Sequence, residues 1–279
     1  MNQEVKKFEE KFDQEKKEIM ILTEGGMSAG KCGGDEYWNV SITILAYVDM
    51  KTGELVEGKK SVEWLATDEQ CQSAEKVHNL QGQTIYQLTV RESLPFMNEY
   101  TGESMDRGRW LMLVDVIDRN CHDPRLESIL KDYQREVFIE VDGCEKLFLD
   151  KSLNLFSGDG IWNGAECCVN LDSDGDGLET ADLALETLQE LMTNCQTWDQ
   201  KAREYAADEL TDLANDWAEE DDIDITNEDF MKRLEISEVC ASPDGDFELF
   251  YNDDDMFYGH VIIVSGNIED GFDSADIAG

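Results

Sequence analysis

The sequence has 279 residues, a length that fits two domains of ordinary size. Hydrophobic residues make up 41% of it and aromatic residues 9%, which is enough to bury a core and excludes a wholly disordered chain. The net charge of −41 repels nucleic-acid phosphates and anionic lipid, so neither nucleic acid nor a membrane is an expected partner.

The charge is concentrated in the second half of the chain. Residues 1–140 contain 17 Lys and Arg against 27 Asp and Glu, a net charge of −10, whereas residues 141–279 contain 6 against 37, a net charge of −31. Such a charge keeps a protein soluble, and it also speeds the encounter with a basic partner. The sequence leaves both interpretations open.

The first 18 residues are highly charged and carry Phe8 and Phe12 four positions apart, which predicts a short amphipathic helix and not an export signal. The longest apolar runs are far shorter than the about 20 residues that cross a bilayer. None of the eight cysteines has the CxxC spacing of a zinc site. We therefore expect a cytoplasmic protein with reduced thiols and no disulfide framework.

A β-rich N-terminal domain is predicted for residues 1–141. Alternating apolar and polar residues predict strands, and one helix is predicted over 124–136, where Leu126, Ile129, Leu130 and Tyr133 share a face. The predicted strands are 19–22, 38–47, 84–90, 110–116 and 137–141.

An acidic α+β domain is predicted for residues 142–279. Strands at 147–149, 153–156 and 165–171 precede helical spacing at 183–192 and 198–217, and Thr226 begins a third short helix as its cap. Strands at 239–241, 247–251 and 257–264 form a closing antiparallel hairpin or meander. Strands, then helices, then strands is typical of an α+β fold.

A glycine-rich segment runs from Gly25 to Lys31 and fits the GxxxxGK skeleton of a phosphate loop. Cys32 stands where a Ser or Thr would bind magnesium, and glycines follow where a helix has to begin. The pattern therefore favours a flexible loop over a nucleotide site.

An aspartate-rich turn formed by Asp172, Asp174 and Asp176 reproduces the first half of a calcium-binding loop. Its twelfth position is Leu183, where such a loop has a bidentate Glu. The turn is either a Ca²⁺ or Mg²⁺ site or a set of carboxylates that cap the next helix. No other cofactor is expected.

One histidine lies close to carboxylates in the sequence: His260 follows Asp253, Asp254 and Asp255. Such a histidine serves as a general base or ligand, or as a hydrogen-bonded structural residue. No GxSxG or HExxH motif occurs, so the sequence favours a protein that is not an enzyme.

The C-terminal half resembles the bacterial domain of unknown function 2262 family. The resemblance is carried by residues 147–156 with Trp162, by Asn215-Asp-Trp217, and above all by Phe257-Tyr-Gly-His260 with residues 273–279. It implies an α+β domain and brings no reaction with it. By analogy with other small acidic bacterial domains, it suggests an immunity-like protein that covers the site of a toxin.

The resulting hypothesis is a non-catalytic binding protein that captures a basic protein partner, such as a toxin. Trp162, Trp217 and Tyr258 are the expected anchor residues, with Asp253, Asp254, Asp255 and His260 beside them. The alternative is a cation-dependent protein or an enzyme that uses the Asp172–Asp176 turn, or His260 with Asp255.

Overall fold

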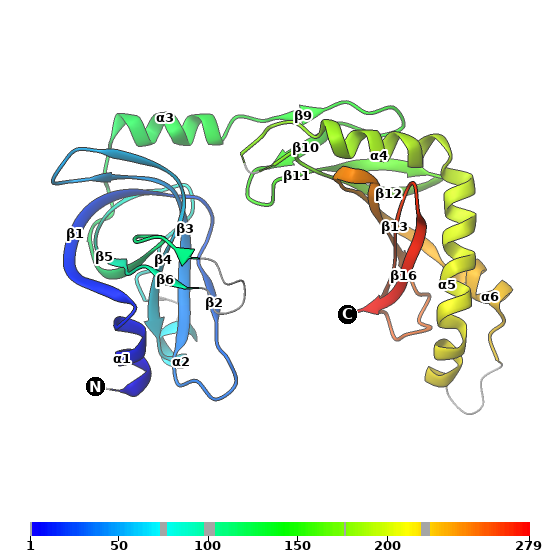
Figure 1. Cartoon of the computed structure of the whole chain (residues 1–279), viewed down its shortest axis with the longest axis horizontal. Coiled ribbons are helices and arrows are strands. Elements are labelled where there is room, and N and C mark those ends of the chain that lie inside the picture. The colour runs from blue at the N-terminus through cyan, green and yellow to red at the C-terminus, as the bar shows by residue number, and fades with distance from the viewer. Residues whose placement is uncertain (1, 73–76, 98–103, 176, 219–223) are drawn as a thin grey trace. The chain divides into compact units, whose positions relative to one another are not determined.

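A computed structural model describes all residues except 1, 73–76, 98–103, 176 and 219–223. The chain divides into two compact units, Met1–Arg135 and Glu136–Gly279 (Figure 1). Strand β9 (Phe138–Ile139), which the sequence pattern assigns to the N-terminal domain, pairs with β10 (Leu147–Asp150) of the second unit.

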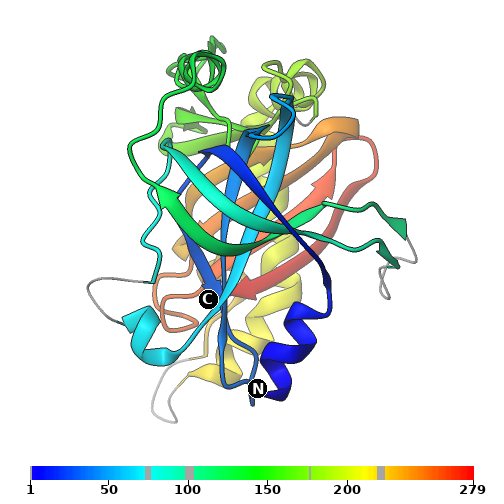
Figure 2. The ribbon, with the colours of Figure 1, turned by 90° about the vertical axis from the view of Figure 1, so that its left-hand side faces the viewer.

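The N-terminal unit is a closed five-stranded barrel, whose curved strands are visible in Figure 2. Each strand is hydrogen-bonded to its neighbour in the order β1-β3-β4-β8-β5-β1, and only β4 and β8 are parallel. This is the connectivity of the OB-fold, a Greek-key barrel. The strands are β1 (Phe12–Thr23), β3 (Trp38–Asp49), β4 (Leu55–Ala66), β5 (Ile85–Ser93) and β8 (Trp110–Asp118).

The barrel is filled by the alternating residues of its strands. In β3, Val40, Ile42 and Ile44 are buried in the barrel core. A register shift between Ile44 and Ala46 then turns the following alternate residues toward α3 (Pro124–Tyr133), whose Leu126 is buried there. The smaller elements are α1 (Gln3–Glu9), β2 (Ser28–Gly30), α2 (Asp68–Gln72), β6 (Phe96–Met97) and β7 (Ser104–Met105).

The C-terminal unit contains an eight-stranded sheet in the order β16-β15-β14-β13-β12-β11-β10-β9. Its pairs are antiparallel except β12 with β13, which the helices α4, α5 and α6 connect. The elements are β11 (Leu155–Trp162), β12 (Ala165–Asp172), α4 (Asp182–Thr193), α5 (Cys195–Trp217), α6 (Asn227–Arg233), β13 (Glu235–Ala241), the 3-10 turn η1 (Pro243–Gly245), β14 (Asp246–Asn252), β15 (Val261–Asn267) and β16 (Gly271–Ala278).

The helices α4 and α5 pack on one face of this sheet. In β14, Phe247, Leu249 and Tyr251 are buried in the core with the helices, whereas Asp246 and Glu248 are exposed. The α+β class and the closing antiparallel meander, β13 to β16, are therefore confirmed. No helix in the described residues is long and apolar enough to cross a membrane.

The sequence analysis missed two strands and placed the start of a third too early, for local reasons. Strand β4 was missed because Glu57, Gly58 and Lys59 interrupt its alternation, and β16 because Asp and Ser fill it. Residues 257–260 form a loop and not the start of a strand. The Thr226 cap is confirmed, since its hydroxyl accepts the Asp229 amide at 3.2 Å.

Candidate functional site

A tight loop, residues 253–260, joins β14 to β15 and is held by one buried carboxylate. Asp253 is 3% exposed, and it accepts backbone N–H groups from Asp255 at 3.2 Å, Phe257 at 2.6 Å and Gly259 at 3.2 Å. A carboxylate surrounded by three N–H groups fixes the path of the chain. Asp253 therefore holds the loop together from inside.

The loop has a strained backbone. Asp254, Asp255 and Tyr258 have φ values of 46°, 62° and 57°, in the left-handed region. Aspartate tolerates this region, but a bulky residue such as tyrosine rarely adopts it. Strain of this kind persists only where surrounding contacts enforce it, and it gathers at ligand clamps and other functional sites.

The strained loop displays Tyr258 on the surface. Its side chain is 67% exposed, its ring stacks on Trp217 at 5.9 Å, and its hydroxyl donates to the Trp217 carbonyl at 2.9 Å. His260 meets the same indole edge-on at 5.5 Å, and its Nδ1–H donates to the Phe257 carbonyl. Among the described residues, no hydrogen bond or ion pair joins His260 to a carboxylate.

The two other aspartates of the loop point their charge outward. Asp254 pairs with Arg233 at 2.8 Å, and the Asp255 carboxylate has no partner among the described residues. Trp217, Tyr258 and His260 thus lie together with exposed Asp254 and Asp255 on one surface, which we call the Tyr258 surface.

Trp162 lies elsewhere and is fully buried, so its side chain is not part of a surface that a partner contacts. Its indole Nε1 donates at 3.2 Å to Asp199 on α5, a carboxylate that is itself 4% exposed. The same carboxylate accepts the Tyr251 hydroxyl at 3.0 Å, the Asn163 amide at 3.0 Å and the Arg203 guanidinium at 2.9 Å. Trp162 is therefore an internal anchor of the unit.

The sequence analysis missed Asp199. Its only local signal is the spacing of four residues to Arg203, which allows an ion pair on a helix. Burial raises the pKa of Asp199, but hydrogen bonds from Arg203, Asn163 and Trp162 outweigh burial, and the net pKa is lowered. Asp199 is therefore ionised at neutral pH.

The aspartate-rich turn caps a helix. Asp174 accepts the backbone N–H groups of Asp182 and Leu183, both at 3.0 Å, at the start of α4. Hydrogen bonds from Thr180 and Leu183 lower the pKa of Asp174. Asp172 accepts the Ser242 hydroxyl at 2.7 Å, and Asp176 lies outside the described residues. Within the described residues, no group of three or more His, Cys, Asp or Glu is placed to hold a metal ion.

A hollow of about 550 Å³ lies beside β11, a feature that the sequence does not signal. Its lining includes the carboxylates Glu145, Asp159 and Glu166, none of which is in an ion pair with another described residue, and the half-exposed Ile161. The thiol of Cys167 also lines it, and burial raises the pKa of that thiol to about 11, so Cys167 is not a nucleophile at neutral pH. The hollow is an acidic surface without an evident catalytic group.

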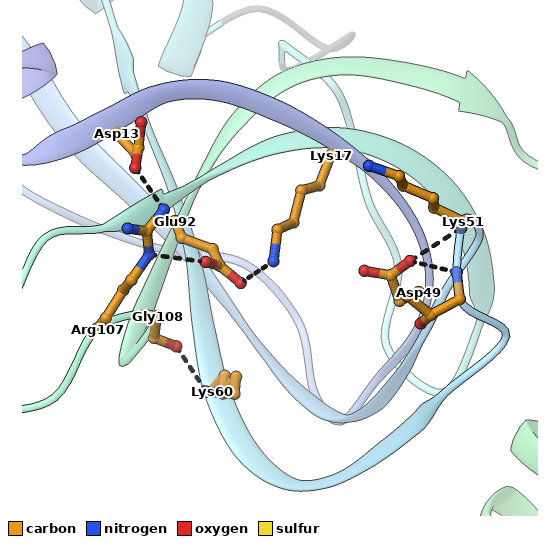
Figure 3. A network of polar contacts seen from close by, with 9 residues as sticks. Asp13, Lys17, Asp49, Lys51, Lys60, Glu92, Arg107 and Gly108 are labelled. Atoms are coloured by element: carbon orange, nitrogen blue, oxygen red, sulfur yellow. Dashed lines mark hydrogen bonds and ion pairs between the residues drawn. The ribbon is translucent and has the colours of Figure 1, made fainter.

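A second polar cluster lies at one end of the N-terminal barrel, where Figure 3 shows Lys17, Glu92 and Asp49 inside the ring of strands. Glu92 accepts Lys17 Nζ at 2.7 Å and Arg107 Nε at 3.2 Å, and Arg107 also pairs with Asp13. Lys17 and Arg107 thus balance the charges of Glu92 and Asp13, whereas Asp49 accepts the backbone N–H groups of Lys51 and Thr52. We interpret the cluster as a set of polar side chains that fills this end of the barrel.

The glycine-rich segment is a loop that contains the short strand β2 (Ser28–Gly30), which pairs with β3. Lys31 pairs with Asp68 at 2.8 Å, and the next regular element is the strand β3 and not a helix. A phosphate loop requires a helix at this point.

Two known families match separate parts of the chain. Residues 143–277 match the family described as "Uncharacterized protein conserved in bacteria (DUF2262)". This match covers the C-terminal half of the chain. Residues 4–133 match a second family, "Domain of unknown function (DUF7021)", and no curated protein matches the chain.

The resemblance to the DUF2262 family is therefore confirmed. The DUF2262 match contains the Tyr258 surface, the Asp199 network, the helix cap and the hollow, whereas the barrel belongs to the other match. Neither description names an activity, so the function has to be argued from the site itself.

Replacing Asp199 by Asn is expected to destabilise the DUF2262 domain by about 3–5 kcal/mol, because Arg203 loses its carboxylate in a buried site. Urea unfolding followed by tryptophan fluorescence measures this loss. The control is Asp212→Asn on the exposed side of α5, which we expect to change stability little. Equal effects of the two substitutions would contradict the role given to the network.

Replacing Glu92 by Gln is expected to reduce barrel stability at pH 7 by about 1–3 kcal/mol. Burial raises the pKa of Glu92, but Lys17 and Arg107 outweigh burial and lower it. The stabilisation is therefore complete above the unfolded pKa of about 4.3 and is lost as the pH falls through the lower folded value. Unfolding curves between pH 7 and pH 2 should converge for wild type and variant, whereas the exposed Glu57→Gln control should parallel the wild type. Curves that stay equally far apart would argue against the ion pairs.

Replacing Asp174 by Ala is expected to cost about 1 kcal/mol through loss of the α4 cap, equally in Ca²⁺ and in EDTA. Thermal unfolding in both buffers measures this, with Glu186→Ala on the exposed side of α4 as control. If Ca²⁺ stabilised the wild type and not the Asp174 variant, the carboxylate would be a metal ligand.

Proposed function

We propose that the protein is a non-catalytic binding protein whose DUF2262 domain captures a basic protein partner through the Tyr258 surface. The observation that carries this proposal is the exposure of Tyr258 on a strained loop beside unpaired acidic charge. Backbone strain gathers at ligand clamps and other functional sites, so the strain at Tyr258 supports a role for this exposed ring in binding.

The charge of the C-terminal unit supports a basic partner. Residues 136–279 contain 6 Lys and Arg against 39 Asp and Glu, a net charge of −33. The net charge already counts all six cations, and five of them are in ion pairs within the unit: Lys146 with Glu140, Lys151 with Glu179, Arg203 with Asp199, Lys232 with Glu228 and Arg233 with Asp254. Such a field steers a basic protein toward the surface.

The geometry of Tyr258 supports an anchor contact. The hydroxyl bond and the stacking on Trp217 already hold the ring, so binding costs little side-chain entropy. The outer face of the ring suits an Arg or Lys of the partner, since a cation is attracted to the face of an aromatic ring. Asp255 adds a negative charge on the same loop.

The finer proposal is an immunity-like role, in which the domain covers the site of a basic toxin. Eight free thiols are compatible with the reducing cytoplasm, the compartment that we propose. Among the described residues, no observation favours the cation-dependent or enzymatic alternative, since Asp174 caps α4 and His260 bonds to a backbone carbonyl.

The test compares the wild type with Tyr258→Asn, because asparagine tolerates the left-handed backbone and the variant is expected to fold at least as stably. Both proteins are used to capture partners from host extract at low salt. We expect a basic protein on the wild type that is absent from the variant.

Calorimetry with that purified protein should then show about 30-fold weaker binding by the variant, as for an interface hot spot. Affinity for the wild type should fall steeply as salt rises. The control is Leu153→Asn, which also removes an exposed apolar side chain but lies far from Tyr258 in the sequence. Partners bound equally by wild type and Tyr258→Asn would refute the Tyr258 surface, and binding insensitive to salt would refute the charge argument.

A further inference from the structure

The outer edge of β16 is free in the C-terminal sheet. β16, drawn in red in Figure 1, is the last strand of this sheet and pairs on one side only, with β15. In an antiparallel ladder, alternate residues of a strand direct their N–H and C=O groups away from the neighbouring strand. Within the described part of the chain, no strand pairs with these outward groups of β16. They are therefore available to an added strand.

This edge is long and reachable. β16 has eight residues, Gly271–Ala278, which at about 3.3 Å per residue gives an edge of about 26 Å. Asp273, Asp276 and Ala278 are exposed along it. Strands of five to six residues are the commonest in proteins, so the edge has room for a whole extended segment.

The charge of the edge disfavours a second copy of the same strand. β16 contains Asp273 and Asp276 and no Lys or Arg. Pairing of β16 with itself would bring like charges together, which destabilises cross-strand pairs. A strand that carries Lys or Arg forms opposite-charge pairs with these aspartates instead. The edge therefore favours a basic segment.

The two faces of the edge differ in chemistry. Ala275 and Ile277 pack against the core of the unit. Asp276 lies between them and points to the opposite face, because successive side chains of a strand alternate. A matching segment has small apolar side chains on the first face and a Lys or Arg beside Asp276 on the second.

Helix α5 borders this edge. Tyr205 of α5 stacks on Phe272 of β16 at 5.6 Å. Burial raises the pKa of the Tyr205 phenol, and the charges of three carboxylates raise it further: Glu209, Asp273 and Asp276. These carboxylates thus lie around one phenol, and none of them is in an ion pair with a described residue. Their negative charge remains available to a basic segment.

One end of β16 lies at the Tyr258 surface. Ala278 pairs with Val261, the residue directly after His260. The backbone of Gly279 is so close to the His260 ring that a Cβ there would lie 2.6 Å from a ring atom. His260 is part of the Tyr258 surface, so a chain bound at that surface can continue along the edge of β16.

We propose that the edge of β16 binds an extended basic segment of the partner protein by strand addition, with backbone hydrogen bonds to β16 and a Lys or Arg beside Asp276. This inference rests on the proposed function for the identity of the partner as a basic protein. The edge itself is tested with a peptide, independently of that partner.

The test measures amide hydrogen exchange by NMR on the ¹⁵N-labelled full chain, with and without the peptide acetyl-Lys-Val-Lys-Val-Lys-Val-Lys-amide. We expect the peptide to slow exchange at alternate residues within 273–278, since only alternate amides of β16 point to the free edge. The same peptide with every backbone nitrogen methylated keeps its charge but has no N–H to donate. It should give no such protection.

The contribution of charge is tested by titrating the same peptide against two variants. Asp276→Asn should weaken binding about 2- to 5-fold, as expected for the loss of one exposed ion pair. The matched control is Glu186→Gln on the exposed side of α4, which removes the same charge away from β16 and should bind the peptide like the wild type.

Tyr258→Asn distinguishes this inference from the proposed function, because the variant should still show the alternate protection by the peptide. The inference is overturned if no alternate protection occurs, if the methylated peptide protects equally, if Asp276→Asn and Glu186→Gln bind the peptide alike, or if Tyr258→Asn loses the protection. Protection by the peptide, together with a partner that binds Tyr258→Asn as well as the wild type, would support the β16 edge and refute the Tyr258 surface.

Discussion

The C-terminal unit depends on the buried carboxylate of Asp199. It joins helix α5 to the hairpin of β11 and β12 through Trp162 and Asn163, and to β14 through Tyr251. Arg203, its ion-pair partner, donates to the carbonyls of Met231 at 3.0 Å and Leu234 at 2.5 Å, which adds the segment between α6 and β13. One ionised group thereby connects the helix layer to the sheet at several points, and its low pKa reflects those bonds.

The same network determines where the Tyr258 surface lies. Tyr251, bonded to Asp199, is one residue from the end of β14, and the loop held by Asp253 begins directly after that strand. Helix α5 runs from Cys195 to Trp217, so Asp199 fixes its beginning and Trp217 lies at its end, under the Tyr258 ring. A helix is a stiff element of about 1.5 Å per residue. The strand that leads into the strained loop and the helix that ends beneath it are thus both bonded to Asp199, while Asp253 and the Trp217 contacts maintain the left-handed tyrosine.

The sequence patterns predicted those elements that interactions between neighbouring residues determine. The helical spacing of Leu188 and Leu191, the alternation in β3 and β14, and the Thr226 cap all follow from neighbouring residues, and the structure has them. Contacts between distant residues were not predictable: Asp199 and Trp162 are 37 positions apart, and nothing in either segment marks the pair. For the same reason the run 253–255 reads as three equivalent charges, although Asp253 is buried and only Asp254 and Asp255 are exposed.

The acidic residues of this chain therefore serve two separate purposes. Some accept hydrogen bonds within the fold, as Asp253, Asp174 and Asp199 do. Asp253 and Asp199 are buried, and Asp174 is held by the N–H groups at the start of α4. Many of the others are exposed at the surface, and their field extends about 10 Å in 0.1 M salt. Salt screens the second group and hardly affects the first, whereas acid protonates both. In a chain built in this way, salt weakens the outer field while the internal bonds persist, and the lowered pKa values of Asp199 and Asp174 keep these two carboxylates ionised to lower pH.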